Sequence, residues 1–444
     1  MLIRFIVSNF MSFKEETEFN MLKSKGNGSR KLIEHVIETK SNVKVLKTAA
    51  IYGANAAGKS NLIKAISFLK SLVVSDVELL VPQSKRFRLD EKYINKSSTF
   101  RIEFEFDDQH FDYAVEIYKG KIVDEWLYLI NSINNEKEEL LYRRENRNVT
   151  FGDYFQKSSD LIYAEKFLKK ELRDTQTVLN ACYNVFDENK ILDKAFNSFE
   201  KIKIFNPDTI DFDYASDILM NQKSNLFTKR LLLESKTGIE DLVSEKTKAD
   251  LFFGYDDNDL KNPENSDDKL RPVVHFVRKG SYNAFIKENN EYFVLILKTK
   301  HFNSNSLFDL DEESDGTNRL FELSPVFEQL IHEGNIVYLI DELERSMHPL
   351  LAKELLKMFS SSKTNKSQLI FTTHESHLLD DEFLRRDEIW FTEKKTDGST
   401  EFYPLSNFNP RGDKVLERGY LQGRYGGIPF LGDFSKLVTE EIQY

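Results

Sequence analysis

Apolar and polar residues alternate strictly in a stretch that begins at position 100. Residues 100–106 place Phe, Ile, Phe and Phe at every second position, and residues 111–117 resume the alternation after the turn Asp107-Asp108. A period of two puts the apolar side chains on one face of a strand. Two such runs joined by a short polar turn predict an antiparallel β-hairpin. A second hairpin is predicted where residues 389–391 and 401–403 flank a Thr-Asp-Gly turn.

Three uninterrupted apolar runs predict a different kind of strand. They cover residues 49–52, 336–340 and 369–371. An unbroken run suits a strand of a parallel sheet that is covered on both faces. Each run is followed by glycine or polar residues, and the carboxyl ends of strands are where ligands bind in open α/β sheets. The pattern therefore predicts an α/β fold with its chemistry at one edge of a sheet.

The middle of the chain carries a helical pattern. Between residues 130 and 250, Phe, Leu and Ile recur at mixed three- and four-residue spacings, which predicts mainly helices. The spacing never becomes a sustained heptad, so we expect a compact helical lobe and no long coiled-coil arm. Residues 255–270 are rich in Asp and Asn around Pro263, and they predict an exposed loop.

The most specific motif follows the first apolar run. Residues 53–60 read GANAAGKS and fit the phosphate-binding pattern G-x-x-x-x-G-K-[ST] at every fixed position. The amphipathic segment 61–66 follows, which completes the strand, loop and helix order that the motif requires. Backbone amides in such a loop form a concave nest at a helix N-terminus, where the helix dipole also favours anions. The sequence therefore predicts a bound nucleoside triphosphate, with Lys59 on the outer phosphates and the Ser60 hydroxyl on Mg²⁺.

Two carboxylates follow the second apolar run. Asp341 is placed to hold the magnesium ion directly or through water, and Glu342, one residue on, to activate the attacking water. A buried strand that ends in two solvated acids is the ordinary alternative, and the phosphate loop upstream disfavours it. The residues expected at the nucleotide, with Asn55 near the γ-phosphate, are Gly53, Ala54, Asn55, Ala56, Ala57, Gly58, Lys59, Ser60 and Asn61.

Two shorter features gain meaning from their order along the chain. The third apolar run ends in Thr372-Thr373-His374, and the turn at residues 313–317 precedes a helical pattern at residues 319–323. A small-residue turn at a helix N-terminus is again an anion site. Taken singly, a histidine at a strand end and a capped helix are ordinary structural features. Their position after the phosphate loop is what makes them candidates for the same site.

The ordered set resembles the ABC-type ATPases, and specifically their SMC, RecF and OLD-like branch. In that resemblance GANAAGKS is the Walker A loop, IVYLIDE the Walker B strand and Ser346-Met347-His348 the D-loop, and the N-terminal MLIRFIVSNFMSF is similar to the first strand. ESDGT stands in place of the signature LSGGQ, and His374 in place of the switch histidine that senses or polarises the γ-phosphate. The resemblance implies that ATP is the nucleotide and that a homodimer or higher homo-oligomer sandwiches it. The residues implied to act across that interface are Ser314, Asp315, Gly316 and Thr317.

A closer resemblance covers nearly the whole chain. The segments EWL at residues 125–127, ESDGTNRL, DELERSMHPLL, FTTHESHLLD and GRYGGIPFL are similar to stand-alone AAA/ABC-type ATPases of bacterial abortive-infection and other phage-defence systems, such as the AbiL and RloA type and the ATPase of the PARIS system. The implied fold is α/β, a split ABC-type head of the P-loop NTPase class with a mixed sheet, an antiparallel sub-sheet and an inserted helical lobe. Residues 1–130 would form the N-terminal part of the head, 131–270 the lobe and 271–444 the C-terminal part.

The resemblance also implies a biological role. The ATPase would be the sensor or scaffold subunit of an anti-phage system, with a phage component as trigger and a separate effector protein, a nuclease among the candidates, as its target. A RecF-like DNA-repair or maintenance ATPase that binds nucleic acid directly is one alternative. A nucleotide-gated adaptor whose slow hydrolysis acts as a timer is another. The lack of a heptad pattern and the acidic charge favour the first.

Composition limits these alternatives. The formal charge of −11 disfavours a surface that grips nucleic acid everywhere, although it allows a local basic cleft. The candidate clusters, each of which we expect to be an ordinary solvated surface, are Lys85-Arg86-Phe87-Arg88, Arg143-Arg144 and Arg385-Arg386. The single cysteine, Cys182, disfavours a disulfide framework and fits a reducing compartment. Neither a long apolar run nor a signal-peptide pattern occurs, so we expect a cytoplasmic protein that does not enter a membrane.

Two further motifs carry little weight. His374-Glu375-Ser376-His377 is one residue short of the zinc-protease motif, so its two histidines would not share a helical face. With eight scattered histidines and one cysteine, no zinc site is expected. The glutamine loop of ABC-type ATPases has two candidates, Gln83 and Gln176, and each also fits an ordinary surface glutamine.

Overall fold

The computed structural model divides the chain into two compact units. Unit 1 contains Met1–Ile204, Asn335–Leu343 and Lys366–Tyr444, and unit 2 contains Phe205–Gly334 and Glu344–Asn365, so the chain passes between the units at four positions. The residues that the structure describes are 1–24, 32–75, 85–131, 137–155, 159–183, 190–205, 218–248, 283–288, 291–362, 365–408 and 416–429. The Asp- and Asn-rich segment 255–270 lies outside these residues.

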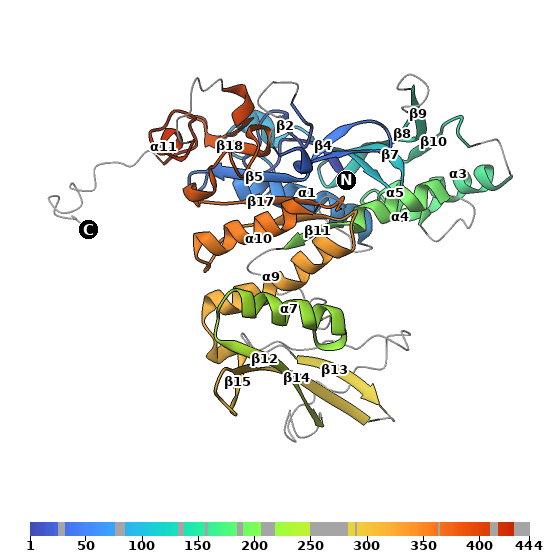
Figure 1. Ribbon diagram of the computed structural model, residues 1–444. Coiled ribbons are helices and arrows are strands. Elements are labelled where there is room, and N and C mark those ends of the chain that lie inside the picture. Colours follow the sequence, from blue (N-terminus) through green and yellow to red (C-terminus); the bar gives the residue numbers. More distant parts are fainter. Residues whose placement is uncertain are drawn as a thin grey trace, which may run out of the picture. The chain divides into compact units, whose positions relative to one another are not determined.

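Unit 1 contains a seven-stranded antiparallel sheet with the strand order β10-β9-β8-β7-β6-β1-β2. The strands β7, β8, β9, β10 and β2 of this sheet are labelled in Figure 1. Its strands are β1 (Leu2–Ser8), β2 (Thr17–Asn20), β6 (Ser98–Phe106), β7 (Gln109–Tyr118), β8 (Lys121–Asn131), β9 (Lys137–Glu145) and β10 (Asn148–Phe151). The hairpin predicted over residues 100–117 is confirmed, because Phe100 pairs with Val115 and Phe104 with Phe111. The apolar residues of β6 are buried, as the period-two pattern requires.

A second sheet of unit 1 has six strands in the order β11-β16-β17-β5-β18-β19. Its strands are β5 (Thr48–Gly53), β11 (Ile202–Phe205), β16 (Val337–Ile340), β17 (Gln368–Thr372), β18 (Ile389–Lys394) and β19 (Thr400–Pro404). The three uninterrupted apolar runs lie in β5, β16 and β17, in which every residue is buried. These strands and β18 pair in parallel, and β18 turns back into β19 as the second predicted hairpin. The α/β class with a mixed sheet and an antiparallel sub-sheet is therefore confirmed.

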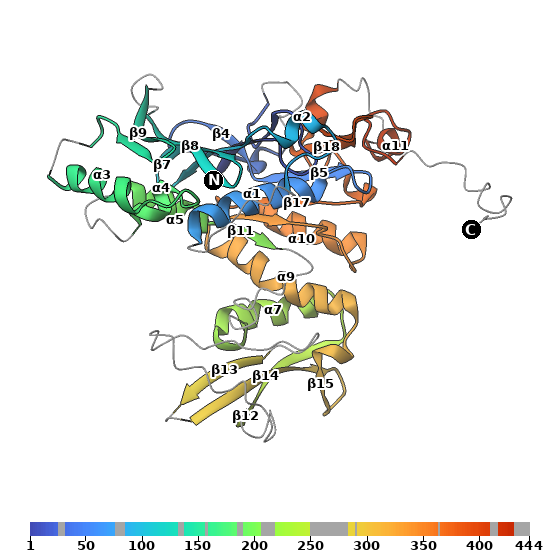
Figure 2. The same ribbon diagram turned by 180° about the vertical axis from the view of Figure 1, so that it is seen from behind.

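One apolar core joins the two sheets of unit 1 to its helices. It contains Phe5 and Phe100 from the antiparallel sheet, Ile370 from the parallel strands, and Leu62 and Ile66 from α1. The helices are α1 (Lys59–Val74), α2 (Glu91–Ile94), α3 (Ser159–Glu171), α4 (Val178–Cys182), α5 (Lys190–Glu200) and α11 (Leu416–Leu421), and α1 and α2 are labelled in Figure 2. A two-stranded sheet of β3 (Val36–Glu38) and β4 (Lys44–Leu46) completes the unit. No helix among the described residues combines the length and apolar character needed to cross a bilayer.

The described residues of unit 2 form three α-helices and a small antiparallel sheet. The helices are α7 (Gln222–Glu234), α9 (Asp315–His332) and α10 (Pro349–Ser361), and the strands are β12 (Ile239–Lys248), β13 (Asn283–Glu288), β14 (Glu291–His301) and β15 (Leu307–Asp309). In both ribbon views α7 lies between α9 and the sheet (Figures 1 and 2). A buried hydrogen bond of 2.7 Å between the hydroxyls of Thr228 and Ser324 joins α7 to α9.

These units have other boundaries than the three segments expected from the sequence. Within residues 131–270, α3, α4 and α5 contribute to the core of unit 1, whereas α7 and β12 belong to unit 2. The same range also contains β9 and β10, which extend the antiparallel sheet. In β9 a bulge interrupts the period of two: Tyr142 pairs with Leu127 and Leu140 with Tyr128, so Leu141 is left over between them.

Candidate nucleotide-binding site

The phosphate loop joins β5 to α1 and is shaped by the β18–β19 hairpin. Gly58 is the N-cap of α1 and has a φ of 113°, and a Cβ there would lie 2.2 Å from Thr400 Oγ1. The same hydroxyl donates to the carbonyl of Ala57 at 2.7 Å. At the other end of the loop, a Cβ on Gly53 would lie 2.2 Å from Thr392 Oγ1. Only glycine fits at these two positions, because a threonine of the neighbouring hairpin occupies the space on each side.

Lys59 and His374 meet at this loop, although 315 positions separate them in the sequence. The ammonium of Lys59 donates to the carbonyls of Gly53 and Ala54, at 2.8 and 3.2 Å, and lies 3.5 Å from Nδ1 of His374. Lys59 is buried, whereas the side chain of His374 is exposed at the end of β17. Two side chains assigned to the outer phosphates from separate motifs therefore lie together.

A chain of hydrogen bonds connects the helix start to the two carboxylates. The Ser60 hydroxyl donates to Asp341 Oδ1 at 3.0 Å, and the buried Thr372 hydroxyl donates to the same oxygen at 2.5 Å. Thr372 Oγ1 also accepts from the backbone N–H of Glu342 at 2.8 Å. Glu342 has a φ of +50°, which is uncommon for a residue with a Cβ. The arrangement holds Asp341 beside Ser60 and fixes the backbone that presents Glu342.

The oxygen groups at this point fit a magnesium ion. The Ser60 hydroxyl and the Asp341 carboxylate lie 3.0 Å apart at a helix N-terminus that favours phosphate. Mg²⁺ is commonly bound by such oxygen ligands together with the oxygens of nucleotide phosphates. Asn55 and Ala56 are exposed at the tip of the loop, where a ligand can reach them. The side-chain amide of Asn61 donates to Ser12 Oγ at 2.6 Å, and this hydroxyl also accepts from Thr400 Oγ1 beside Gly58 of the loop.

The role of Thr372 was not predicted from the sequence. Its only signal was that the apolar run at residues 369–371 ends in two threonines ahead of His374. Because β17 lies between β16 and β5, a hydroxyl at its carboxyl end reaches both the Walker B carboxylate and the next backbone amide. Threonine suits this position since one hydroxyl both donates and accepts.

The signature-like turn belongs to unit 2. Ser314 is the N-cap of α9, and its hydroxyl accepts from the backbone N–H of Thr317 at 3.2 Å. Asp315 is the first residue of the helix. A Cβ on Gly316 would lie 2.8 Å from the carbonyl oxygen of Ser346, so the turn packs directly against the D-loop segment. The elements that the resemblance assigns to a second chain's nucleotide therefore lie together in one unit.

Glu313 anchors this turn to the sheet of unit 2. Its Oε1 accepts from Thr299 Oγ1 at 2.5 Å and pairs with His301 Nε2 at 2.8 Å, and both partners lie on β14. The side chain of Glu313 is 7 % exposed. Because Glu313 directly precedes the N-cap Ser314, the sheet fixes the entry into α9.

The glutamine loop is not supplied by Gln176. Its side-chain amide donates to Asn180, whose own amide donates to the carbonyl of Val73 at the C-terminal end of α1. The sixteen residues of α1 span about 24 Å at 1.5 Å per residue, so Gln176 lies at the far end of the helix from Lys59. Gln83, the other candidate, lies outside the described residues.

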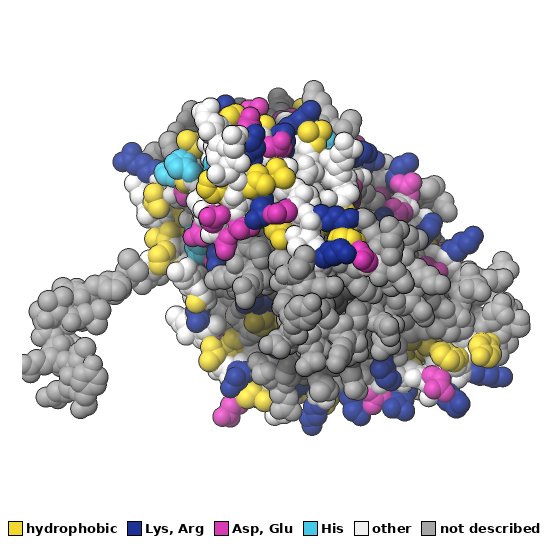
Figure 3. Space-filling model, turned by 90° about the horizontal axis from the view of Figure 1, so that it is seen from below, with side chains coloured by type: hydrophobic (Ala, Val, Ile, Leu, Met, Phe, Trp, Pro, Cys, Tyr) yellow, Lys and Arg dark blue, Asp and Glu magenta, His cyan; other side chains and the backbone are white. Residues whose placement is uncertain are grey.

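The three basic clusters are solvated only in part: Lys85, Arg88 and Arg143 are exposed and Arg386 is partly exposed, whereas each cluster also contains one buried arginine. Arg86, Arg144 and Arg385 are each no more than 4 % exposed. Arg144 donates to three backbone carbonyls and forms an ion pair with the buried Glu125, and Arg385 pairs with Asp387. Figure 3 shows Lys and Arg side chains interspersed with Asp and Glu over the described part of one face. The buried arginines Arg86, Arg144 and Arg385 contact the protein itself and are not available to a nucleic acid.

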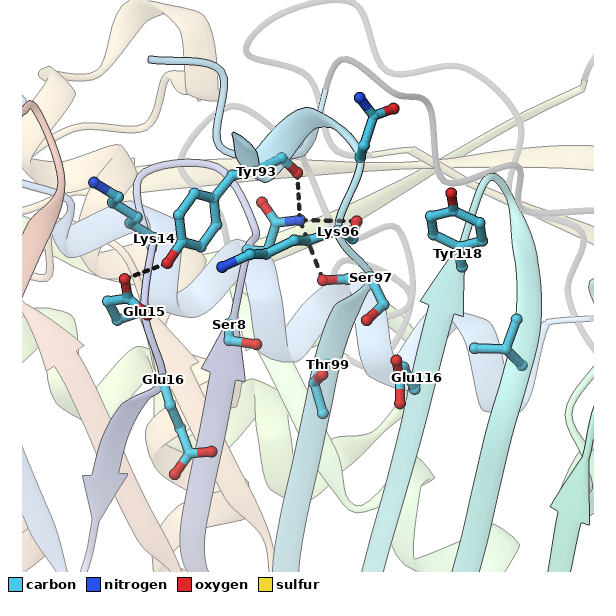
Figure 4. Close-up of a pocket in the computed structure, with 13 residues that line it drawn as sticks. Ser8, Lys14, Glu15, Glu16, Tyr93, Lys96, Ser97, Thr99, Glu116 and Tyr118 are labelled. Atoms are coloured by element: carbon cyan, nitrogen blue, oxygen red, sulfur yellow. Dashed lines mark hydrogen bonds between the residues drawn. The ribbon is translucent and has the colours of Figure 1, made fainter. Parts of the chain in front are cut away.

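A cavity of about 620 Å³ lies elsewhere in unit 1, and Glu15, Tyr93, Lys96 and Tyr118 are among the residues that line it (Figure 4). The Asn9 side-chain amide donates to the carbonyls of Tyr93, Lys96 and Ser97, which fixes one wall. The Tyr93 hydroxyl donates to Glu15. The lining contains no residue of the phosphate loop and neither carboxylate of the Walker B strand, so this cavity is separate from the candidate site.

Comparison with known proteins places the chain in a family. A family model described as "AAA domain, putative AbiEii toxin, Type IV TA system" matches residues 49–173 and 185–380. No curated protein matches the chain. The matched residues cover more than half of the chain and include the phosphate loop, Asp341, Glu342 and His374.

Solved structures of SMC heads are also similar. The SMC head domain from Thermotoga maritima has 14 % identity and a TM-score of 0.40, covering 91 % of this chain and 98 % of that one. The Smc head bound to the C-terminal winged-helix domain of ScpA has 14 % identity and a TM-score of 0.42, covering 91 % and 97 %. The Smc head with an extended coiled coil bound to the C-terminal domain of ScpA from Pyrococcus furiosus has 14 % identity and a TM-score of 0.39, covering 95 % and 98 %. On the family match, the chain belongs to the AAA-domain family described as putative AbiEii toxins of type IV toxin–antitoxin systems.

Proposed function

We propose that the protein binds and hydrolyses ATP as an ABC-type ATPase head that dimerises around nucleotide. The observation that carries the proposal is the hydrogen-bond chain from Ser60 through Asp341 and Thr372 to the backbone of Glu342. It brings the Walker A and Walker B motifs to one sheet edge, where Lys59 also meets His374. Membership of an AAA-domain family supports the same conclusion.

In the proposed reaction each residue acts by position and charge. Lys59 binds the outer phosphates, which would draw its ammonium away from the carbonyls of Gly53 and Ala54. Ser60 and Asp341 would hold Mg²⁺, which would neutralise charge on the phosphates when bound. Glu342 accepts a proton from the attacking water, and His374 contacts the γ-phosphate.

The signature-like turn would act on the nucleotide of a second chain. Phosphate binding belongs to unit 1, while Ser314, Gly316 and the adjoining D-loop segment belong to unit 2. The exposed N-terminus of α9, with the Ser314 hydroxyl at its first turn, suits a γ-phosphate presented from outside the chain. Asp315 and Thr317 lie in the same turn and would approach that nucleotide too.

Concentration dependence tests the composite site. If half of each site comes from a partner, ATP turnover per chain must fall steeply below the dimerisation constant. Glu342→Gln should retain ATP binding, lose turnover and accumulate as a dimer in ATP and Mg²⁺, measured by light scattering after size exclusion. Turnover per chain that stays constant down to nanomolar protein, together with a monomeric mass in ATP, would contradict the proposal.

For the biological role we propose a sensor or scaffold subunit of an anti-phage defence system that controls a separate effector protein. The family description names a putative AbiEii toxin of a type IV toxin–antitoxin system, and this supports a role in a system of more than one protein. The burial of Arg86, Arg144 and Arg385 removes one cation of each basic cluster from contact with a nucleic acid, which weighs against direct nucleic-acid binding by these three residues. Affinity purification of tagged Glu342→Gln from its native cells, with ATP and Mg²⁺, tests the role. A stoichiometric second protein supports it, and DNA without a protein partner would favour the DNA-maintenance alternative.

A further inference from the structure

The C-terminal helix α11 holds the loop that follows the candidate switch histidine. Glu417 Oε1 accepts from the hydroxyl of Ser376 at 3.1 Å and lies 2.7 Å from Nδ1 of His377. Ser376 and His377 begin the short 3-10 helix Ser376–Leu378, only two residues after His374. The Glu417 side chain is 26 % exposed, so one carboxylate oxygen at a partly buried position serves two partners of this loop.

The same C-terminal segment, residues 416–427, is itself fixed on the strands that carry the phosphate loop. The ring of Tyr420 stacks on Phe391 of β18, with centroids 5.5 Å apart and planes 19° apart. It also contacts the ring of Tyr52 at 5.8 Å, and Tyr52 directly precedes Gly53 on β5. The Tyr420 hydroxyl donates to the carbonyl of Gly427 at 3.1 Å, which closes the segment on itself. These contacts fix the position of α11, which carries Glu417.

Hydrogen bonds within the loop between β17 and the 3-10 helix connect the contacts of Glu417 to the backbone at His374. The backbone N–H of Glu375 donates to Thr373 Oγ1 at 3.0 Å, and that of His377 donates to the Glu375 carboxylate at 3.1 Å. Hydrogen bonds therefore connect Thr373 and Glu375, the two neighbours of His374, to His377, which pairs with Glu417. The His374 side chain lies 3.5 Å from the Lys59 ammonium, and the backbone of this loop sets where that side chain begins.

We infer that Glu417 is a positioning residue for the switch histidine, through which the C-terminal segment sets the rate of ATP hydrolysis. The inference rests on the proposed ATPase function and adds to it a control element outside the known motifs. Glu417 does not contact the phosphate loop in this structure; it acts on Ser376 and His377. It should therefore affect the chemical step, in which His374 contacts the γ-phosphate, and leave ATP binding by Lys59 and Ser60 unchanged.

Steady-state kinetics of the full chain in wild-type and His374→Ala backgrounds test the inference. Glu417→Ala should lower kcat roughly tenfold, the kinetic equivalent of one lost hydrogen bond to a charged group, and leave KM for ATP within about twofold. In the His374→Ala background the same substitution should have no further effect, because residues that act through one group are not additive. Glu401→Ala is the matched control, since that carboxylate is half exposed on β19 and forms a surface ion pair with Lys395.

Two conservative variants separate positioning from folding. Glu417→Gln keeps an acceptor for Ser376 but loses the charge beside His377, so its kcat should lie between wild type and Glu417→Ala. Ser376→Ala removes the hydroxyl that donates to Glu417 and should also lower kcat. An unchanged kcat in all three variants, or an equal further loss in the His374→Ala background, overturns the inference. If the wild-type protein itself does not hydrolyse ATP, the proposed function fails instead.

Discussion

Mixing two inactive variants would show whether each ATP site is completed by a second chain. Lys59→Ala damages the phosphate loop in unit 1, and Gly316→Val damages the signature-like turn in unit 2. In a composite site, a mixed dimer keeps one intact pair: the phosphate loop of the Gly316 variant with the turn of the Lys59 variant. Random pairing of equal amounts makes half of the dimers mixed, each with one of two sites, so we expect roughly one quarter of wild-type turnover.

The geometry at Gly316 sets the size of the defect. A Cβ there would lie 2.8 Å from the carbonyl oxygen of Ser346, about 0.6 Å inside ordinary contact distance. Overpacking of this kind costs about 1–3 kcal/mol, and valine adds two further methyl groups. A displacement of the turn worth that much free energy in the transition state lowers turnover roughly 5- to 150-fold. ATP affinity of the isolated chain should be unchanged because the phosphate loop is untouched.

The assay is phosphate release at a protein concentration well above the dimerisation constant, with ATP affinity followed separately by a fluorescent nucleotide analogue. A matched control mixes Lys59→Ala with Glu342→Gln, which damage the same half of the site and should give no recovery. Turnover in the first mixture equal to the mean of its parents would refute the composite site. Loss of ATP affinity in Gly316→Val would refute the assignment of this turn to the partner's nucleotide.

Three further predictions concern groups that hold the fold and site. Thr372→Val removes a hydroxyl that donates to Asp341, so turnover should fall roughly tenfold or more while Thr372→Ser stays near wild type, measured as phosphate release. Burial raises the pKa of the Cys182 thiol, so less reactive thiolate forms, and a thiol reagent at pH 8 should label no cysteine in the native chain and one after unfolding. Arg144→Met leaves the buried Glu125 carboxylate without its cation, which should destabilise unit 1 by about 3–5 kcal/mol, seen as a lower urea midpoint in far-UV circular dichroism; an unchanged midpoint would contradict the assigned ion pair.

The parts of the site that could be predicted from the sequence are those set by local backbone geometry. The spacing from Gly53 to Lys59 is dictated by a strand, a tight loop and a helix start, and it holds in the structure. Asp341 could be expected near Ser60 because parallel strands bring their carboxyl ends to one edge. These expectations needed no knowledge of which strands are neighbours.

Features that depend on strand order or on distant partners could not be predicted. Thr372 acquires its role only because β17 lies between β16 and β5. Arg144 was expected on the surface because no sequence motif marks its partners, which are Glu125 and three backbone carbonyls. In unit 2, the pairing of β12 with β14 could not be predicted because β14 begins more than forty residues further along the chain.

The position of β5 has a consequence for biosynthesis. This strand, which carries the phosphate loop, pairs on one side with β17 and on the other with β18, so that Ala50 meets Phe371 and Ile389. Both partners leave the ribosome more than three hundred residues later, a delay of roughly 15 to 60 seconds at about 5–20 residues per second. During that time the Walker A segment of a nascent chain lacks both neighbours in its sheet. Competence for nucleotide should therefore arise late in translation, when β17 and β18 are complete.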